Sequence, residues 1–291
     1  MRTIDETSRG AWIVQEHSLR VLESVVRACE ADGVAVLPVK GILSARTLYA
    51  DVAERVISDI DVRVRKGNVE RVERIARREG WTLVNRMWSY DNLVLRVDGR
   101  FVDVEAHVGP PGVCALTIDT MMSRASLERR TFGFPALVAD PHDHAVLLLV
   151  NAFKDHMATA MSWAIDDLVR LIRAPWFDES VLLERARAAK VETIVWIVAE
   201  WMSRFMSDEA WGALRDRIGP PPRTAFASAH LWLESHKREL PLRVLSRFAS
   251  DRPRLWLSAV GHLTAWQLEV WWSQLGPGPW RRGVTSPPRP R

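Results

Sequence analysis

The hydrophobic pattern of the chain changes near residue 140, and this change limits the possible fold more than any other feature. Before it, short apolar runs rich in β-branched residues alternate with segments of helical periodicity. After it, the apolar residues recur at the three- and four-residue steps of amphipathic helices. A chain of 291 residues is long enough to form more than one hydrophobic core. We therefore predict an α+β unit followed by an all-helical unit.

The first 110 residues predict a small mixed sheet with helices packed on it. An amphipathic helix is expected over residues 11–32. The elements expected after it are a strand at 34–39, a helix at 42–53, a strand at 56–64, a helix at 67–79 and strands at 81–89, 92–97 and 100–108. Asp98-Gly99 is a strong signal for a tight turn, which pairs the last two strands.

The region after residue 140 predicts helices without a clear strand. Asp140-Pro141 starts it, with aspartate as N-cap and proline at the first helical position. Helices are expected at about 141–156, 161–173, 178–190, 191–206, 208–218, 222–237 and 253–274. The tryptophan-rich last helix is expected to pack in the core, with a base-stacking surface as the alternative. We predict domains at 1–135 and 136–274, and a disordered tail rich in proline and arginine at 275–291.

Charge and composition restrict the partners and the compartment. The net charge of +4 and the pI near 9.4 favour an anionic partner such as a nucleotide or RNA. An arginine-rich surface without such a partner is the alternative. No apolar run approaches the roughly 18 residues that a membrane helix needs, and the N-terminus shows no secretory signal. With Cys29 and Cys114 as its only cysteines, the chain is expected in the reducing cytoplasm, away from membranes.

The segment Ser58-Asp59-Ile60-Asp61 carries the clearest chemical signal. Successive side chains of a strand point to opposite faces, so Asp59 and Asp61 share one face while Ile60 points to the core. Two carboxylates about 7 Å apart on one face repel each other unless a cation lies between them. Mg²⁺ or Mn²⁺ suits such oxygen ligands. The alternative is an exposed strand face on which both acids are simply hydrated.

A later strand repeats the pattern. Asp103 and Glu105 have the same two-residue spacing, again between apolar neighbours. If this strand lies beside the first one, three or four carboxylates converge, and three carboxylates can hold a pair of metal ions. His107 lies on the same face two residues further on, where a strand-end residue without a role is the simpler interpretation.

Two cationic positions are candidates for phosphate contacts. Lys40-Gly41 is expected between a strand and a helix, where free N–H groups, a close backbone approach and a lysine charge suit a triphosphate. Such a turn is common, so it is weak evidence by itself. Arg63 follows Asp61 on the same strand face and could contact the same phosphates, although surface arginines are also common.

Residues 37–64 resemble the core of the polymerase-β-like nucleotidyltransferase superfamily, most of all its bacterial branch of uncharacterised nucleotidyltransferases. The matching features are Lys40-Gly41, Leu48-Tyr49 and Ser58 to Asp61. The resemblance covers about 34–108 well and 140–172 loosely. It implies an α+β fold, with a nucleotidyltransferase core followed by a C-terminal all-helical domain. It also implies a third metal carboxylate on a later strand, which Asp103 matches.

The chain departs from the family pattern at three places. Where the superfamily has a Gly-Ser pair, this chain has Gly41-Ile42 and thus no hydroxyl. Where the branch often has histidine two residues after the third aspartate, this chain has Glu105, with His107 further on. In residues 163–168 (WAIDDL), either Asp166 or Asp167 could match an aspartate of the branch's helical domain.

The resemblance implies transfer of a nucleoside monophosphate from an NTP such as ATP to an acceptor hydroxyl. Asp59 and Asp61 would bridge two Mg²⁺ or Mn²⁺ ions, and Asp103 would hold the catalytic ion and help to deprotonate the acceptor. The residues that would contact the triphosphate are Lys40, Gly41 and Arg63. The acceptor could be RNA such as tRNA, a protein or a modified peptide, whereas the positive charge disfavours an aminoglycoside-like sugar. A partner protein such as an antitoxin is also possible.

Two alternatives to an enzyme remain at this point. The missing hydroxyl after Gly41 would suit a catalytically degenerate module that holds a nucleotide or a partner protein. A helical interaction protein with an incidental acidic strand is the other. The helix at 141–156 has His142 and Asp143 in its first turn and Asp155 and His156 in its last, about 20 Å apart, so we expect structural roles for them. Lys154 of the same helix could face the cleft.

Overall fold

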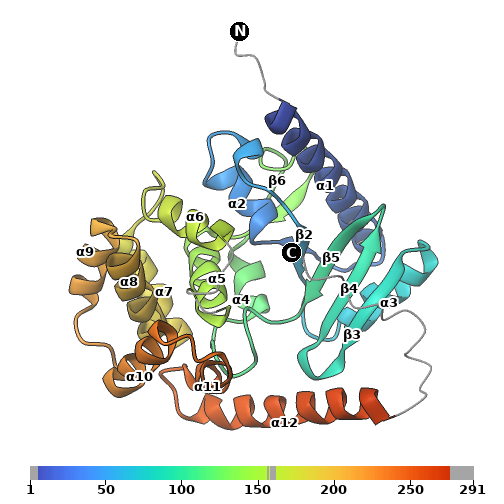
Figure 1. Cartoon of the computed structure of the whole chain (residues 1–291). Helices are drawn as coiled ribbons and strands as arrows, with labels where there is room; N and C mark the ends of the chain where they lie inside the picture. The colour runs from blue at the N-terminus through green and yellow to red at the C-terminus, as the bar shows by residue number, and fades with distance from the viewer. Residues whose placement is uncertain (1–5, 156, 158–161, 276–291) are drawn as a thin grey trace.

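The computed structural model describes residues 6–155, 157 and 162–275 (Figure 1). The predicted tail, apart from its first residue, lies outside the described residues. The expected order of an α+β part followed by a helical part is confirmed. Two hydrophobic clusters underlie these parts, the first around the sheet and the second among the later helices. The domain limits 1–135 and 136–274 stay a prediction.

A five-stranded mixed sheet forms the centre of the first part. Its strands are β1 (Leu37–Pro38), β2 (Asp59–Arg63), β3 (Thr82–Met87), β4 (Asn92–Val97) and β5 (Arg100–Glu105), in the order β1-β2-β5-β4-β3. β2 and β5 run parallel, whereas the other neighbours run antiparallel. The predicted turn joins β4 to β5, since Asp98 and Gly99 have φ angles of 46° and 80° and Val97 pairs with Arg100. Positive φ at both positions suits the tight hairpin turn that the sequence predicts.

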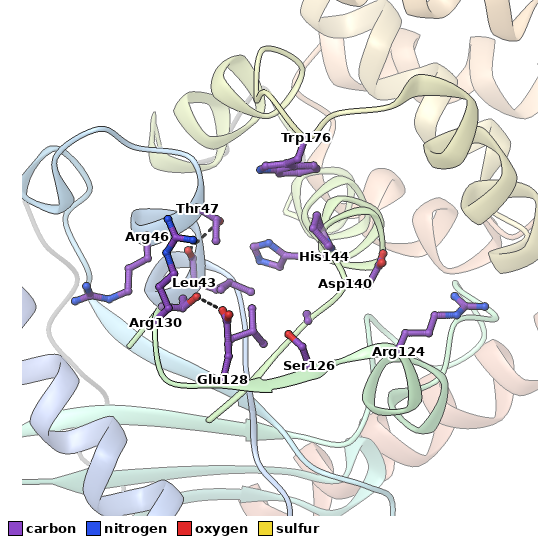
Figure 2. Close-up of a pocket in the computed structure, with 14 residues that line it drawn as sticks. Leu43, Arg46, Thr47, Arg124, Ser126, Glu128, Arg130, Asp140, His144 and Trp176 are labelled. Carbon is purple, nitrogen blue, oxygen red and sulfur yellow. Dashed lines mark hydrogen bonds between the residues drawn. The ribbon is translucent and has the colours of Figure 1, made fainter. Parts of the chain in front are cut away.

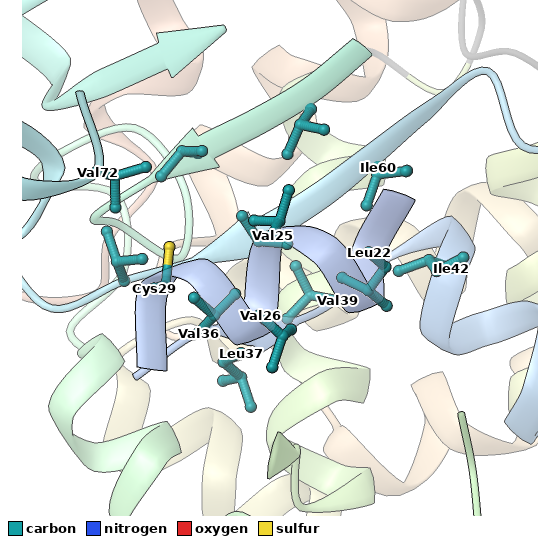
Figure 3. Packing of buried hydrophobic residues seen from close by; sticks show 14 of the residues in the cluster. Leu22, Val25, Val26, Cys29, Val36, Leu37, Val39, Ile42, Ile60 and Val72 are labelled. Atoms are coloured by element: carbon teal, nitrogen blue, oxygen red, sulfur yellow. The ribbon is translucent and has the colours of Figure 1, made fainter. Parts of the chain in front are cut away.

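The alternation of apolar residues in β2 and β5 decides which face of the sheet is packed by helices. Ile60 and Val62 of β2 are fully buried, as are Val102 and Val104 of β5. Helices α1 (Glu6–Ala31) and α3 (Val69–Arg78) supply apolar residues to this core. Figure 3 shows the buried face of α1 packed near β2, with Leu22, Val25, Val26 and Cys29 among the residues labelled. The other residues of β2 and β5 therefore point away from this core, toward the candidate site.

Several elements of the first part are shorter than predicted or were missed. The strand expected at 34–39 is only β1, and the helix expected at 42–53 is α2 (Gly41–Thr47) followed by the single turn η1 (Val52–Glu54). The sequence did not reveal the turn η2 (Trp88–Tyr90), the helix α4 (Ile118–Arg124) and the hairpin of β6 (Ser126–Glu128) and β7 (Ala136–Val138). Strands of three residues are too short to display a period of two.

The second part is a helical assembly that begins at the predicted N-cap. Asp140 accepts hydrogen bonds from the amides of His142 and Asp143 at 3.0 and 3.1 Å. The helices are α5 (Pro141–Lys154), α6 (Ser162–Leu171), α7 (Glu179–Ala189), α8 (Glu192–Phe205), α9 (Glu209–Ile218), α10 (Thr224–Ser235), α11 (Glu239–Leu245), η3 (Ser246–Phe248) and α12 (Arg254–Leu275). Of these, α11 and η3 were not predicted. Within the described residues, no helix combines the length and apolarity that crossing a membrane requires.

The prediction that the last helix packs in the core is wrong for much of α12. Leu257, Leu268 and Trp271 are 79%, 59% and 54% exposed, whereas Ala259 is buried. In Figure 1, α12 runs along the lower edge of the molecule, from α11 toward the sheet strand β3. Apolar residues occur around the whole circumference of this helix, but only one side of it has neighbours among the described residues. Periodicity alone could not show this difference.

Candidate functional site

The register of the central parallel pair brings three carboxylates together. Asp61 of β2 lies opposite Asp103 of β5, and Arg63 lies opposite Glu105. One carboxylate oxygen each of Asp61, Asp103 and Glu105 lies within 4.8 Å of the others. The strand adjacency on which the predicted convergence depends is therefore present, and it places two of the predicted acids, together with Glu105, around one point.

Asp59 lies outside this group. It is paired with Phe101 in the register, and its Oδ1 accepts a 2.6 Å hydrogen bond from the hydroxyl of Ser58. Ser58 is exposed and Asp59 is half-buried. The metal-binding role of Asp59 stays a prediction, whereas Glu105, left undecided by the sequence, is a member of the cluster.

Lys40 supplies a positive charge directly at the cluster. Its Nζ lies 2.6 Å from Asp61 Oδ1, and its side chain is only 16% exposed. Burial opposes the ammonium charge, but the nearby charges of Asp61 and Glu105 outweigh burial and raise the pKa of Lys40 above its ordinary value. Lys40 is thus a cation among carboxylates.

The backbone of Lys40 is held in an unusual conformation by a buried histidine. Its φ of 53° and ψ of −134° are uncommon for a residue other than glycine. The amide of Lys40 donates a 3.0 Å hydrogen bond to Nε2 of His144 at the start of α5. Burial lowers the pKa of His144 to about 3, so the ring is neutral and can accept this bond. No sequence signal linked these two residues, which are 104 positions apart.

The acids of the cluster have different electrostatic surroundings. Nη2 of Arg63 lies 2.8 Å from Oε2 of Glu105, and the Arg63 side chain is 1% exposed. Although burial raises the pKa of Glu105, the charges of Arg63 and Lys40 prevail and lower it to about 2. Asp103 accepts a 2.5 Å hydrogen bond from Asn92, and burial together with the charges of Glu105 and Asp61 raises its pKa to about 7. The predicted Arg63 is therefore at the site, paired with Glu105.

A second group of contacts lies beside the Lys40-Gly41 turn. Asp167 of α6 is buried and accepts a 2.7 Å hydrogen bond from the Tyr49 hydroxyl. It also accepts hydrogen bonds from Nε and Nη2 of Arg55, at 2.9 and 3.1 Å. Asp166 is exposed, so of the two aspartates it is Asp167 that contacts the sheet-containing part. Sequence reasoning noted Leu48-Tyr49 but missed Arg55.

Gly41 has a steric reason to be glycine. A Cβ atom at this position would lie 3.3 Å from Nη2 of Arg55, which is tighter than most real contacts, and 3.5 Å from its central carbon, which is an ordinary contact distance. The positive φ of the turn is at Lys40, not at Gly41. The glycine therefore admits the Arg55 guanidinium to the turn.

The cluster opens onto a cavity of about 760 Å³. Asp103 and Glu105 line it from β5, His107 lines it from the segment just after β5, and Lys154 lines it from α5, as the sequence suggested. Strands β3 and β4 add further lining residues, and another wall comes from α11, η3 and α12, including Arg247 and Trp266. Such a volume is within the range of small-molecule and cofactor sites.

A second cavity, of about 630 Å³, lies among α2, the β6–β7 hairpin and the start of α5. Figure 2 shows His144 and Trp176 on its upper side and Arg130 near Thr47. His144 thus contacts this cavity and the Lys40 backbone at once.

The other histidines and acids of α5 have structural partners. His142 Nε2 accepts a 3.0 Å hydrogen bond from the amide of Asp178. Asp143 is buried and forms a 2.9 Å ion pair with Arg124. His156 lies outside the described residues. These contacts agree with the structural roles expected for His142 and Asp143.

The fold and the site together define a class of protein. A cluster of carboxylates with a lysine, at the edge of a cavity of this size, has the oxygen ligands that a divalent cation needs and a positive charge that suits phosphate. The sequence comparison then gives the family: residues 7–207 match the model described as uncharacterised nucleotidyltransferase, and the chain belongs to this family. The match includes the sheet, the carboxylate cluster and α5 to α8.

Two solved structures are similar at low identity. One is a solution structure of the antibiotic-resistance factor ANT(2'')-Ia, with 12% identity, a TM-score of 0.42, and coverage of 77% of this chain and 98% of that chain. The other is a crystal structure of ANT(2'')-Ia in complex with adenylyl-2''-tobramycin, with 13% identity, a TM-score of 0.42, and coverage of 58% and 95%. No curated protein matches the chain.

Proposed function

We propose that this protein transfers a nucleoside monophosphate from an NTP, such as ATP, to an acceptor hydroxyl with the help of Mg²⁺ or Mn²⁺. The observation that carries the proposal is the convergence of Asp61, Asp103 and Glu105 within 4.8 Å, in a chain that belongs to a nucleotidyltransferase family. This donor set consists of carboxylate oxygens and so fits a hard divalent cation. Asp61, Asp103 and Glu105 would hold the cation, and Asp59 is kept as the predicted additional ligand.

The chemistry that a divalent cation supplies at such carboxylates is neutralisation of phosphate charge and activation of the attacking oxygen. In the transfer, the acceptor oxygen forms a bond to the α-phosphorus, the bond to the bridging oxygen breaks, and pyrophosphate leaves. Lys40, beside Asp61, is assigned to the triphosphate together with Gly41 and Arg63. Asp103, which lines the larger cavity, is assigned to the proton of the acceptor hydroxyl.

The acceptor is proposed by class only. The net charge of +4 supports an anionic acceptor such as tRNA, and a protein or a modified peptide also offers a hydroxyl. A positively charged aminoglycoside is less favoured by this charge. A partner protein, and a reducing cytoplasmic compartment for the two free cysteines, stay predictions.

The second candidate function is a degenerate module that binds a nucleotide without turnover. It is favoured by Ile42, which follows Gly41 and is fully buried, so that no hydroxyl at this position meets a ligand. Tight NTP binding that is independent of Mg²⁺ and leads to no product would support this candidate over the enzyme.

The direct test is incubation with labelled NTPs and Mg²⁺, alone and with tRNA or cell lysate, followed by detection of labelled acceptor. Asp61→Asn and Asp103→Asn are expected to lower transfer by at least about 100-fold, since even the loss of an outer-shell metal contact costs about 10- to 100-fold. Asp98→Asn is the matched control, because asparagine tolerates the positive φ of this turn. Unchanged transfer in both cluster variants would end the assignment.

A further inference from the structure

Arg55 lies beside the turn that is assigned to the triphosphate. Its Nη2 and Nη1 atoms would be 3.3 and 3.7 Å from a Cβ atom on Gly41, so the guanidinium covers this glycine directly. Gly41 is the neighbour of Lys40, whose ammonium contacts the carboxylate cluster. Two cationic side chains thus meet the same two-residue turn.

The position of Arg55 is fixed by hydrogen bonds that use only some of its N–H donors within the described part of the chain. Asp167 binds Nε and Nη2 as a fork at 2.9 and 3.1 Å, and Nη1 donates to the carbonyl of Val56 at 2.5 Å. Each terminal nitrogen of a guanidinium carries a pair of N–H donors, so one donor on Nη1 and one on Nη2 have no hydrogen-bond partner among the described residues. Both nitrogens are the ones that face Gly41.

The anchor of Arg55 is itself restrained. The Tyr49 hydroxyl donates to Asp167 at 2.7 Å, and the Asp167 side chain is 3% exposed. The guanidinium is therefore held at the turn before any ligand arrives, which lowers the entropy cost of binding. A planar guanidinium with free N–H donors is well suited to phosphate oxygens.

We propose that Arg55 binds the triphosphate of the NTP at the Lys40-Gly41 turn, with Asp167 and Tyr49 as its positioning residues. This assignment rests on the proposed nucleotidyltransferase function. In this role, Arg55 donates hydrogen bonds to the phosphate at a turn where the buried Ile42 side chain has no donor to offer. The competing interpretation is that Arg55 and Asp167 only join the sheet-containing and helical parts.

The test measures ligand affinity in the full-length chain by calorimetry with three probes: MgATP, inorganic tripolyphosphate and adenosine. Arg55→Lys keeps a charge opposite Asp167 but removes the planar fork. We expect its affinity for MgATP and tripolyphosphate to fall about 10-fold or more, as for the loss of a charge-assisted hydrogen bond. Its affinity for adenosine should not change, because adenosine carries no phosphate.

Arg170→Lys is the matched control. Arg170 stacks 4.2 Å above the Tyr49 ring and pairs with Glu54 at 2.9 Å, so it is nearby, whereas the atoms nearest to a Cβ on Gly41 all belong to Arg55. Its affinities should equal those of the wild type. An equal loss in Arg170→Lys and Arg55→Lys would overturn the assignment, since a general change at this surface would then explain it.

The outcomes separate the two proposals. If the wild type binds neither MgATP nor tripolyphosphate, the proposed function itself fails. If the wild type binds both and folded Arg55→Lys binds them equally well, the function stands and Arg55 has no phosphate role. Should Arg55→Lys not fold, Asp167→Asn loosens the anchor and is expected to weaken tripolyphosphate binding about threefold or more. An unchanged affinity in that folded variant overturns the proposal.

Discussion

His144 shows how a single buried side chain can determine the geometry of a charged site. Its Nε2 fixes the amide of Lys40, and the Nζ of the same lysine lies 2.6 Å from Asp61. A histidine that is neutral can accept at one ring nitrogen, and burial keeps His144 neutral. His144 is therefore a positioning residue for Lys40.

We expect His144→Leu to lower nucleotide transfer because the Lys40 amide loses its acceptor, at a cost of about 1–3 kcal/mol for a buried unpaired group. His144→Gln offers a carbonyl oxygen in a similar place and should retain most of the activity. His142→Leu is the control, since it removes the same kind of bond from Asp178 instead of Lys40. Equal activity in His144→Leu and His142→Leu would contradict the positioning role.

The same histidine predicts a loss of stability in acid. Its pKa is about 3 in the folded protein and 6.5 as the ordinary value, so between these values the unfolded chain binds a proton that the folded one does not. Stability from this group is present above pH 6.5 and falls as the pH falls toward 3. From pH 7 to pH 5, the unfolding free energy should drop by about 2 kcal/mol more in the wild type than in His144→Gln. Denaturant titrations at both values measure it, and identical drops would refute the explanation.

Among individual residues, the sequence predicted those whose role can be recognised from the neighbouring positions in the chain. The two-residue spacing in Asp59-Ile60-Asp61 and in Asp103-Val104-Glu105 indicated acids on one strand face, and the structure places Asp61, Asp103 and Glu105 together. The roles of Arg55 and His144 could not be predicted, because each depends on a partner more than 100 residues away along the chain.

Among the secondary-structure elements, β2 and β5 determine the site through their register. Parallel pairing with Asp61 opposite Asp103 places both acids on one face, and a shift by one residue would turn one of them into the core. The buried set of Ile60, Val62, Val102 and Val104 prevents such a shift. The apolar alternation that reveals the strands therefore also fixes the acids.

The attachment of α12 depends on a close approach of backbone to backbone at Gly112. A Cβ at this position would lie 2.5 Å from the Leu255 carbonyl oxygen and 2.6 Å from the Ala259 amide nitrogen, and Gly112 has a φ of 85°. We expect Gly112→Ala to displace the start of α12 and to destabilise the protein by about 1–3 kcal/mol. Hydrogen exchange of residues 254–275 should become faster.

Gly133→Ala is the control that distinguishes the effect of backbone strain from the effect of a clash with α12. Gly133 has a φ of 84° but no heavy atom within 4 Å of an added Cβ. Its variant should lose stability from strain without faster exchange in α12. Equal exchange of α12 in both variants would argue against the proposed contact.

At the scale of the whole molecule, the two parts with their separate hydrophobic clusters meet at a polar contact and at a cavity. Tyr49 and Arg55 from the sheet side meet Asp167 from the helical side, and the 760 Å³ cavity has walls from both. The sequence predicted the order of the two parts because periodicity is local. It could not predict how they face each other, since that depends on contacts between distant segments.

Ligand binding should stabilise the complete chain. At 100 times its dissociation constant, MgATP adds about 2.7 kcal/mol, which corresponds to a rise in Tm of roughly 5–10 °C for a chain of this size. Asp61→Asn should lose the part of this rise that requires Mg²⁺. Thermal unfolding with and without nucleotide measures it. An unchanged Tm in the wild type would favour an interaction protein with an incidental acidic strand.

The course of α12 restricts how far the two parts can separate. The helix starts beside Gly112, and near its far end Glu269 accepts hydrogen bonds from the amides of Trp88 and Ser89 at 2.9 and 3.1 Å. A helix that is attached at both ends limits the distance between its two attachment points. Any widening of the larger cavity must therefore bend α12 or release Glu269 from the β3–β4 connection.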